Sequence, residues 1–226
     1  NTSGGISALD SMSAGNATDN TAVGYDAGTA ITTGDYNSAF GSLSLDVTTT
    51  GQRNTGIGYG ALSDNTTGST NTAVGSNALN ANTTANHNTA VGFKALESNT
   101  TGHSNVGVGN SALDENTTGS DNTAVGFRAL DANTTASSNT AVGGGALGAN
   151  TASVNTAVGS ACLAGNTTGT YNAAVGRLAG YINTTGSNIT AMGYDALRGN
   201  TTGNDNTAFG FQALRTNTTG VQNVGV

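Results

Sequence analysis

Apolar residues recur along this chain at a spacing of 17 residues. The segment Asn71–His87 reads N-T-A-V-G-S-N-A-L-N-A-N-T-T-A-N-H, and this order returns through most of the sequence. We number the repeat positions 1 to 17 from the opening Asn. Position 4 is Val, Ile, Phe or Met, position 5 is Gly, and position 9 is Leu in most copies. Such strict spacing predicts an ordered repeat structure.

The repeat divides the chain into a short first segment and a long array. We interpret residues 1–19 as a degenerate first coil with Ile6 at position 4, and residues 20–226 as a continuous array with one residue deleted near Thr151. Because the chain begins with Asn1 and ends inside a repeat, we expect a fragment of a longer fibre. Position 1 of the array is occupied by Asn20, Asn37, Asn54, Asn71, Asn88, Asn105, Asn122, Asn139, Asn155, Asn172, Ile189, Asn206 and Asn223.

The period predicts an all-β fold, a parallel β-solenoid of about 13 coils. A 17-residue unit is too short for a pair of helices but suits one coil, stacked about 4.8 Å from the next. Thr and Val favour strands, and Gly and Asn favour the bends. We expect Val at position 4 and Leu at position 9 to point inward, with Gly at position 5 allowing the bend. Where Gly28 and Gly180 replace Leu, Ile31 and Ile182 are expected to refill the space.

Ala at position 3 should face away from Val at position 4, because side chains alternate along a strand. The interior predicted for one coil is thin, with one Val, one Leu and two Ala. We therefore expect the small, flat Ala column to pack against another copy of the chain in a symmetric homo-oligomer.

Composition and charge narrow the classes of function. The net charge is −7 with only six Lys and Arg residues, which argues against a nucleic-acid partner. No run is long and apolar enough to span a membrane, and no signal peptide is recognisable. Cys162 is the single cysteine, so it forms no intrachain disulfide, and it occupies a position that is usually Ala. Charged residues fall only at the variable positions, which predicts that these face solvent.

The segments Asn71–Leu79 and Asn122–Leu130 carry a family resemblance. Their N-T-A-V-G-x-x-A-L order resembles the head repeat of trimeric autotransporter adhesins, which also occurs in bacteriophage tail fibres and other surface fibres. The resemblance covers the chain from about Asn20 onward. It implies a left-handed β-roll, three chains per fibre, and an extracellular structural or adhesive role. The unit here is longer than the adhesin repeat by an inserted N-T-T-G turn.

The sequence offers no constellation for catalysis. His87 and His103 lie at variable turn positions without a repeated acidic or nucleophilic partner. G-x-G pairs such as Gly107 and Gly109 lack the strand–loop–helix context of a phosphate-binding loop. Acidic residues do not follow the nonapeptide calcium-binding pattern. We therefore expect no enzyme activity, no cofactor and no metal.

The N-T-T triplets admit two interpretations, a stacked Asn ladder at a turn or N-glycosylation. We favour the ladder and keep glycosylation as a hypothesis for intact-mass measurement. The asparagines concerned are Asn65, Asn82, Asn99, Asn116, Asn133, Asn166, Asn183, Asn200 and Asn217.

Aromatic residues at position 6 form a second pattern. They alternate with small residues in the first part of the array, so that rings would not crowd at strand spacing. We interpret this alternation as packing, and surface contact with a glycan is the alternative. The residues are Tyr25, Tyr59, Phe93, Phe127, Tyr194 and Phe211. Ice binding ranks lower, because adjacent Thr residues point to opposite sides of a strand.

These patterns lead to three functional hypotheses. The first is a rigid spacer in an extracellular fibre, such as an adhesin or a tail fibre, because uniform repeats suit a scaffold whereas a specific site requires irregularity. The second is a glycan- or surface-binding module that uses the aromatic or Asn/Thr columns. The third is a self-assembling extracellular filament formed through exposed strand edges.

Overall fold

The computed structural model describes residues 1–11 and 17–226. They form two compact units, Asn1–Thr118 and Gly119–Val226, and each is described by itself. The strands of the first unit are β1 (Thr2–Gly4), β2 (Thr21–Val23), β3 (Ser38–Phe40), β4 (Thr55–Ile57), β5 (Thr72–Val74), β6 (Thr89–Val91) and β7 (Val106–Val108). Those of the second unit are β8 (Thr123–Val125), β9 (Thr140–Val142), β10 (Thr156–Val158), β11 (Ala173–Val175), β12 (Thr190–Met192), β13 (Thr207–Phe209) and β14 (Val224–Gly225).

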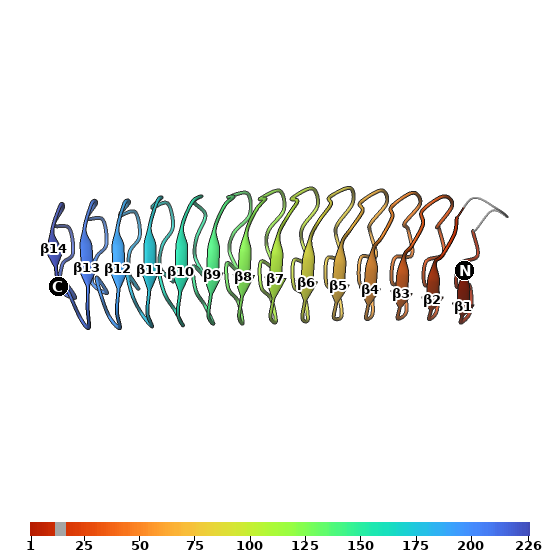
Figure 1. Ribbon diagram of the computed structural model, residues 1–226, viewed down its shortest axis with the longest axis horizontal. Helices are drawn as coiled ribbons and strands as arrows, with labels where there is room; N and C mark the ends of the chain where they lie inside the picture. Colours follow the sequence, from red (N-terminus) through yellow and green to blue (C-terminus); the bar gives the residue numbers. More distant parts are fainter. Residues whose placement is uncertain (12–16) are drawn as a thin grey trace. The chain divides into compact units, whose positions relative to one another are not determined.

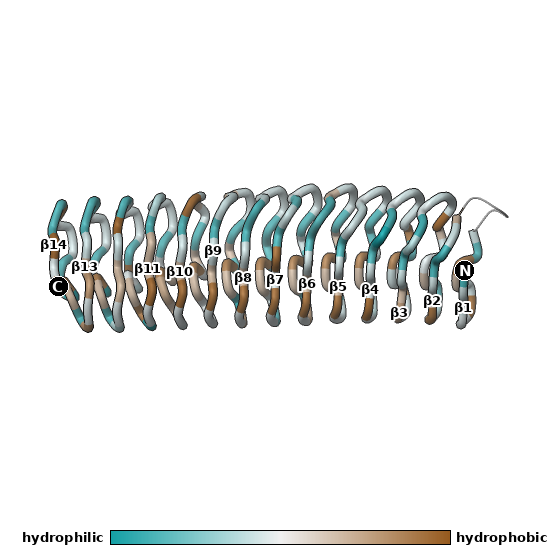
Figure 2. Tube along the Cα trace, in the orientation of Figure 1, coloured by the Kyte–Doolittle hydropathy of each residue, from teal (hydrophilic) through white to brown (hydrophobic). Residues whose placement is uncertain are grey.

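Each unit is a parallel β-solenoid with one short strand per coil (Figure 1). Strands pair in register, so that each repeat position meets its own copy, as where Ala73 pairs with Ala90 and Val74 with Val91. The predicted all-β fold with coils 17 residues apart is confirmed. Hydrophobic residues recur at the same places from coil to coil within each unit (Figure 2).

The prediction of which strand residue points inward was wrong. Ala at position 3 is buried and Val at position 4 is exposed, as in β2, where Ala22 is 0% exposed and Val23 is 43% exposed. The interior explains this choice, because it has space at position 3 for little more than a methyl group. A Cβ atom added at Gly107 would lie 3.3 Å from Leu96 Cγ. A Val at this position would therefore collide with the Leu that packs opposite it.

Leu at position 9 and Ala at position 8 are both buried although they are neighbours. The backbone makes this geometry by entering the left-handed region at position 9, as at Leu79, where φ is 51°. Gly at position 5 follows the strand and begins the turn, and there the next coil approaches closely. A Cβ atom at Gly92 would lie 2.5 Å from the carbonyl oxygen of Gly109, which explains why this position is always Gly.

Two irregular coils are filled in different ways. At Gly28, the space that Leu would take is occupied by Ile31, whose Cδ1 lies 3.1 Å from a Cβ built there, as expected. At Gly180, the expected filler, Ile182, is exposed. The space is instead filled by Leu163 and by Ile189, the residue that replaces the Asn of position 1.

The first coil and the deletion are also located by the strand pairing. Gly4 pairs with Val23, so Gly4 rather than Ile6 occupies position 4, and the first coil starts at Asn1. In the shortened coil, the Nδ2 atom of Asn150 donates to the carbonyl of Ala152, two residues later, at 2.6 Å. In other coils the equivalent Asn donates to the carbonyl three residues later, as Asn99 does to Gly102. The deleted residue is therefore the exposed Thr of position 14. In the interior, the buried Nδ2 atom of Asn139 loses the hydrogen bond that Asn122 makes to the carbonyl of Ala136.

Candidate functional site

Two asparagine ladders run through the interior of each unit. At position 12, the Nδ2 atom of Asn82 donates to Asn65 Oδ1 at 2.8 Å and to the carbonyl of Ala85 at 3.2 Å. At position 1, the Oδ1 atom of Asn71 accepts from the backbone N–H of Asn88 at 2.9 Å. These amides satisfy buried backbone groups and link each coil to the next.

The ladder includes the asparagines of the N-T-T triplets. Asn65, Asn82, Asn99, Asn116, Asn133, Asn166, Asn183 and Asn200 are 0% exposed, and Asn217 is half-buried. A glycan on Nδ2 of a buried member would displace its hydrogen bonds and open the coil. This placement supports the ladder interpretation, and glycosylation remains a hypothesis. Another triplet, Asn188-Ile189-Thr190, has an exposed Asn188 and was not singled out from the sequence.

The outer face of the strands carries an apolar stripe. We define the strand stripe as the side chains of positions 4 and 6 in each unit. Position 4 is exposed by about two-fifths in many coils, as at Val23, Ile57 and Val175. Position 6 adds exposed aromatic residues at Tyr25, Tyr59, Phe93, Phe127, Tyr194 and Phe211. Contiguous exposed apolar surface of this kind is typical of interaction sites.

The aromatic residues of the stripe are arranged differently in the two units. In the first unit, Tyr25, Tyr59 and Phe93 lie on alternate coils, about 9.6 Å apart at two strand spacings. In the second unit, Tyr194 and Phe211 lie on successive coils and stack, with ring centroids 5.6 Å apart and planes inclined by 12°. The prediction that rings on successive coils would crowd was therefore wrong, because neighbouring rings can stack with an offset.

The remaining residues considered for chemistry do not come together. His87 and His103 are exposed turn residues. Cys162 is buried, and burial raises the pKa of its thiol to about 12, which keeps it protonated and unreactive at neutral pH. Within residues 1–11 and 17–226, no three His, Cys, Asp or Glu side chains gather closely enough to hold a metal ion. In the same residues, no helix has the length and apolar character needed to cross a membrane.

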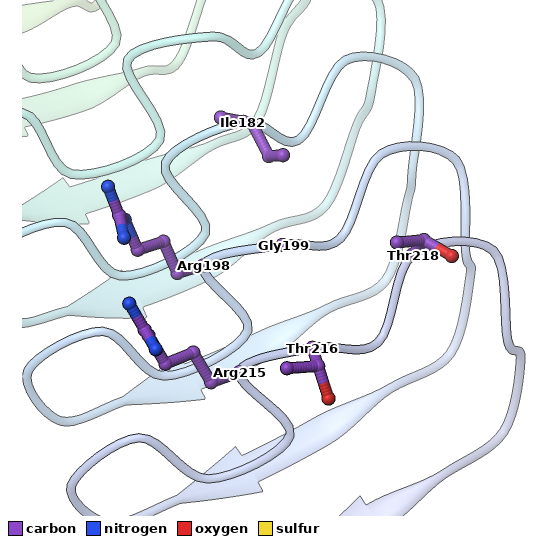
Figure 3. A pocket seen from close by; sticks show the side chains of 6 residues that line it. All are labelled: Ile182, Arg198, Gly199, Arg215, Thr216 and Thr218. Carbon is purple, nitrogen blue, oxygen red and sulfur yellow. The ribbon is translucent and has the colours of Figure 1, made fainter.

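A surface groove in the second unit is lined by Ile182, Arg198, Gly199, Arg215, Thr216 and Thr218 (Figure 3). Its volume is about 470 Å³. The sequence analysis did not identify it, because all of its residues except Thr218 occupy variable positions, and they come from three successive coils. A basic residue at position 10 in two coils in a row is the signal that could have found it.

Comparisons with protein families, with curated proteins and with solved structures find no match. The resemblance to adhesin head repeats thus stays a prediction from the repeat residues.

Proposed function

We propose that this chain is a structural segment of an extracellular fibre, in which several copies associate side by side through the strand stripe. The observation that carries the proposal is the repetition of exposed Val, Ile or Phe at position 4, coil after coil, over an interior that is already complete without them. Exposure of these apolar side chains does not stabilise a monomer, whereas their burial between copies would stabilise an assembly.

The contact face in this proposal differs from the one expected from the sequence. The Ala column, which the sequence suggested as the contact face, is buried within each coil. The Val column takes its place and presents larger side chains. A symmetric arrangement of three copies, the number that the resemblance implies, would bring three such stripes to a common axis.

The experiment is a measurement of molar mass in solution by light scattering and sedimentation velocity. We expect an oligomer for the unmodified chain and a smaller species for the double variant Ile57→Lys, Val91→Lys, because the lysines place charge in the stripe. The matched control is Thr67→Lys, Thr101→Lys, which adds the same charge at the same coil spacing on exposed position 14. A monomeric unmodified chain, or equal loss of mass in both variants, would contradict the assembly.

The second candidate is surface or glycan binding by the aromatic residues of the stripe. The observation in its favour is the exposure of Tyr25 and Tyr59, which have no ring partner on the next coil, where Ser42 and Ser76 stand. A glycan array on the unassembled chain tests it, because assembly through the strand stripe would cover these rings. Binding that is lost in the Tyr25→Ser, Tyr59→Ser variant would favour this role. An array without signal would leave the structural role as the only candidate.

A further inference from the structure

The charged residues of the coils follow a pairing rule that reverses in one place. In two coils a base at position 7 pairs with an acid at position 10: Lys94 Nζ with Glu97 Oε2 at 2.8 Å and Arg128 Nε with Asp131 Oδ2 at 2.8 Å. In the coil that begins at Ile189, the acid comes first, with Asp195 at position 7 and Arg198 at position 10. Arg198 therefore occupies a repeat position, position 10, that is acidic or neutral in the preceding coils.

The next coil also has an arginine at position 10, but it has no acidic residue at position 7. Arg215 occupies position 10, but Gln212 occupies position 7. Asp195 consequently serves both arginines, with Oδ1 3.6 Å from Nε of Arg198 and Oδ2 3.3 Å from Nε of Arg215. Asp195 is only 3% exposed, whereas the two arginine side chains are 39% and 43% exposed. One buried carboxylate between two guanidinium groups leaves an excess of one positive charge at the surface.

This local excess contrasts with the rest of the chain. Residues 172–226 contain Arg177, Arg198 and Arg215 against Asp195 and Asp205, which sum to +3 − 2 = +1. The whole chain has a net charge of −7, so residues 1–171 carry −7 − 1 = −8. An anion that approaches this protein is therefore repelled along most of the array and attracted at these coils.

The two arginines border the groove and are held in place. In Figure 3 their side chains lie side by side and point in the same direction from successive coils. Arg198 is also positioned by Tyr181, whose ring centroid lies 5.9 Å from its Cζ atom. A second hollow, lined by Tyr181 and Thr184 among others, shares Ile182 with the first and extends it toward the preceding coil. Preorganised guanidinium groups lose less entropy when they bind an acid group.

The lining favours a sugar chain over other anions. Ile182 offers an apolar surface to a sugar ring, and Thr216 and Thr218 line the same groove. A peptide strand would need free backbone groups, but in this region the N–H of Ile182 donates to Arg198 O at 3.3 Å and that of Gly199 to Arg215 O at 2.9 Å. A polyphosphate has no apolar face to place against Ile182.

We propose that this groove binds an acidic polysaccharide, with one carboxylate or sulfate group held between the guanidinium groups of Arg198 and Arg215. Guanidinium groups recognise both oxyanions by paired, charge-assisted hydrogen bonds. The ion pairs with Asp195 run through Nε of each arginine, and in this proposal the terminal nitrogens hold the ligand. The site lies where the repeat is irregular, next to Ile189 and Gly180, and it does not depend on assembly through the strand stripe.

The test is calorimetric titration of the full chain with four probes: polygalacturonate oligosaccharides, dextran sulfate, neutral dextran and poly-glutamate. We expect binding of at least one acidic polysaccharide, which identifies the acid group, no binding of neutral dextran, and weaker binding at higher salt. Arg198→Gln, Arg215→Gln should raise Kd at least about tenfold. Arg128→Gln is the matched control, an exposed arginine of the same unit that also pairs with an aspartate.

Four results would overturn the proposal: no binding of either acidic polysaccharide, equal binding of neutral dextran, equal loss in Arg128→Gln, or tighter binding of poly-glutamate, which would assign the groove to an acidic protein. Circular dichroism of each variant reports the fold. If the double variant is misfolded, Arg215→Gln alone replaces it, with the same expected direction. Light scattering on the same samples separates this result from the assembly proposal, because both arginines lie outside the strand stripe.

Discussion

Truncation of one ladder asparagine should lower the local stability of the coils around it. In Asn99→Ala, Asn82 Oδ1 loses its donor at 3.2 Å, and the Nδ2 group of Asn116 loses its acceptor at 2.8 Å. The third partner, the carbonyl of Gly102, keeps the amide of Asn88 at 2.9 Å. Two buried polar groups are thus left short of a hydrogen bond. At about 1–2 kcal/mol for each, local stability should fall by about 2–4 kcal/mol.

Hydrogen exchange followed by mass spectrometry measures this loss directly, because a solenoid can open locally without global unfolding. A loss of this size corresponds to exchange that is about 30 to 1,000 times faster in the peptides around Asn99. The control is Asn110→Ala, which removes the same side chain at exposed position 6 and should change stability by less than about 0.5 kcal/mol. Equal exchange in the two variants would refute the view that the buried ladder holds the coils together.

Two further predictions concern the thiol and the triplets. Burial raises the pKa of Cys162 from its ordinary 9.0 to about 12, so the stability that the neutral thiol contributes is complete below pH 9 and declines as the pH rises toward 12. Urea unfolding at pH 8 and pH 10.5 should show this decline in the unmodified chain and less of it in Cys162→Ala; identical pH dependence would contradict it. After expression in a glycosylating host, intact mass should show no glycan on the buried N-T-T asparagines, whereas exposed Asn188 remains accessible to modification. A mass increase that maps to Asn99 would contradict the ladder.

The repeat itself was sufficient to predict the fold. A period of 17 residues with Gly and Asn at the bends allows one coil per unit, and strict repetition forces identical positions to stack in register. The Asn ladder followed from the same reasoning, because an invariant amide in a stacked coil meets its own copy. These properties depend on spacing and residue type along one coil, so they can be deduced without knowledge of the interior.

The tertiary structure decided which side of each strand is the inside. Alternation shows that Ala73 and Val74 face opposite ways but does not say which way is inward. That choice depends on the width of the interior, which is set by the Leu that arrives from the other side of the coil. The sharing of Asp195 by Arg198 and Arg215 likewise joins residues of two coils. The 17-residue pattern therefore determined the coil, and only packing between its two sides determined which surface the protein presents.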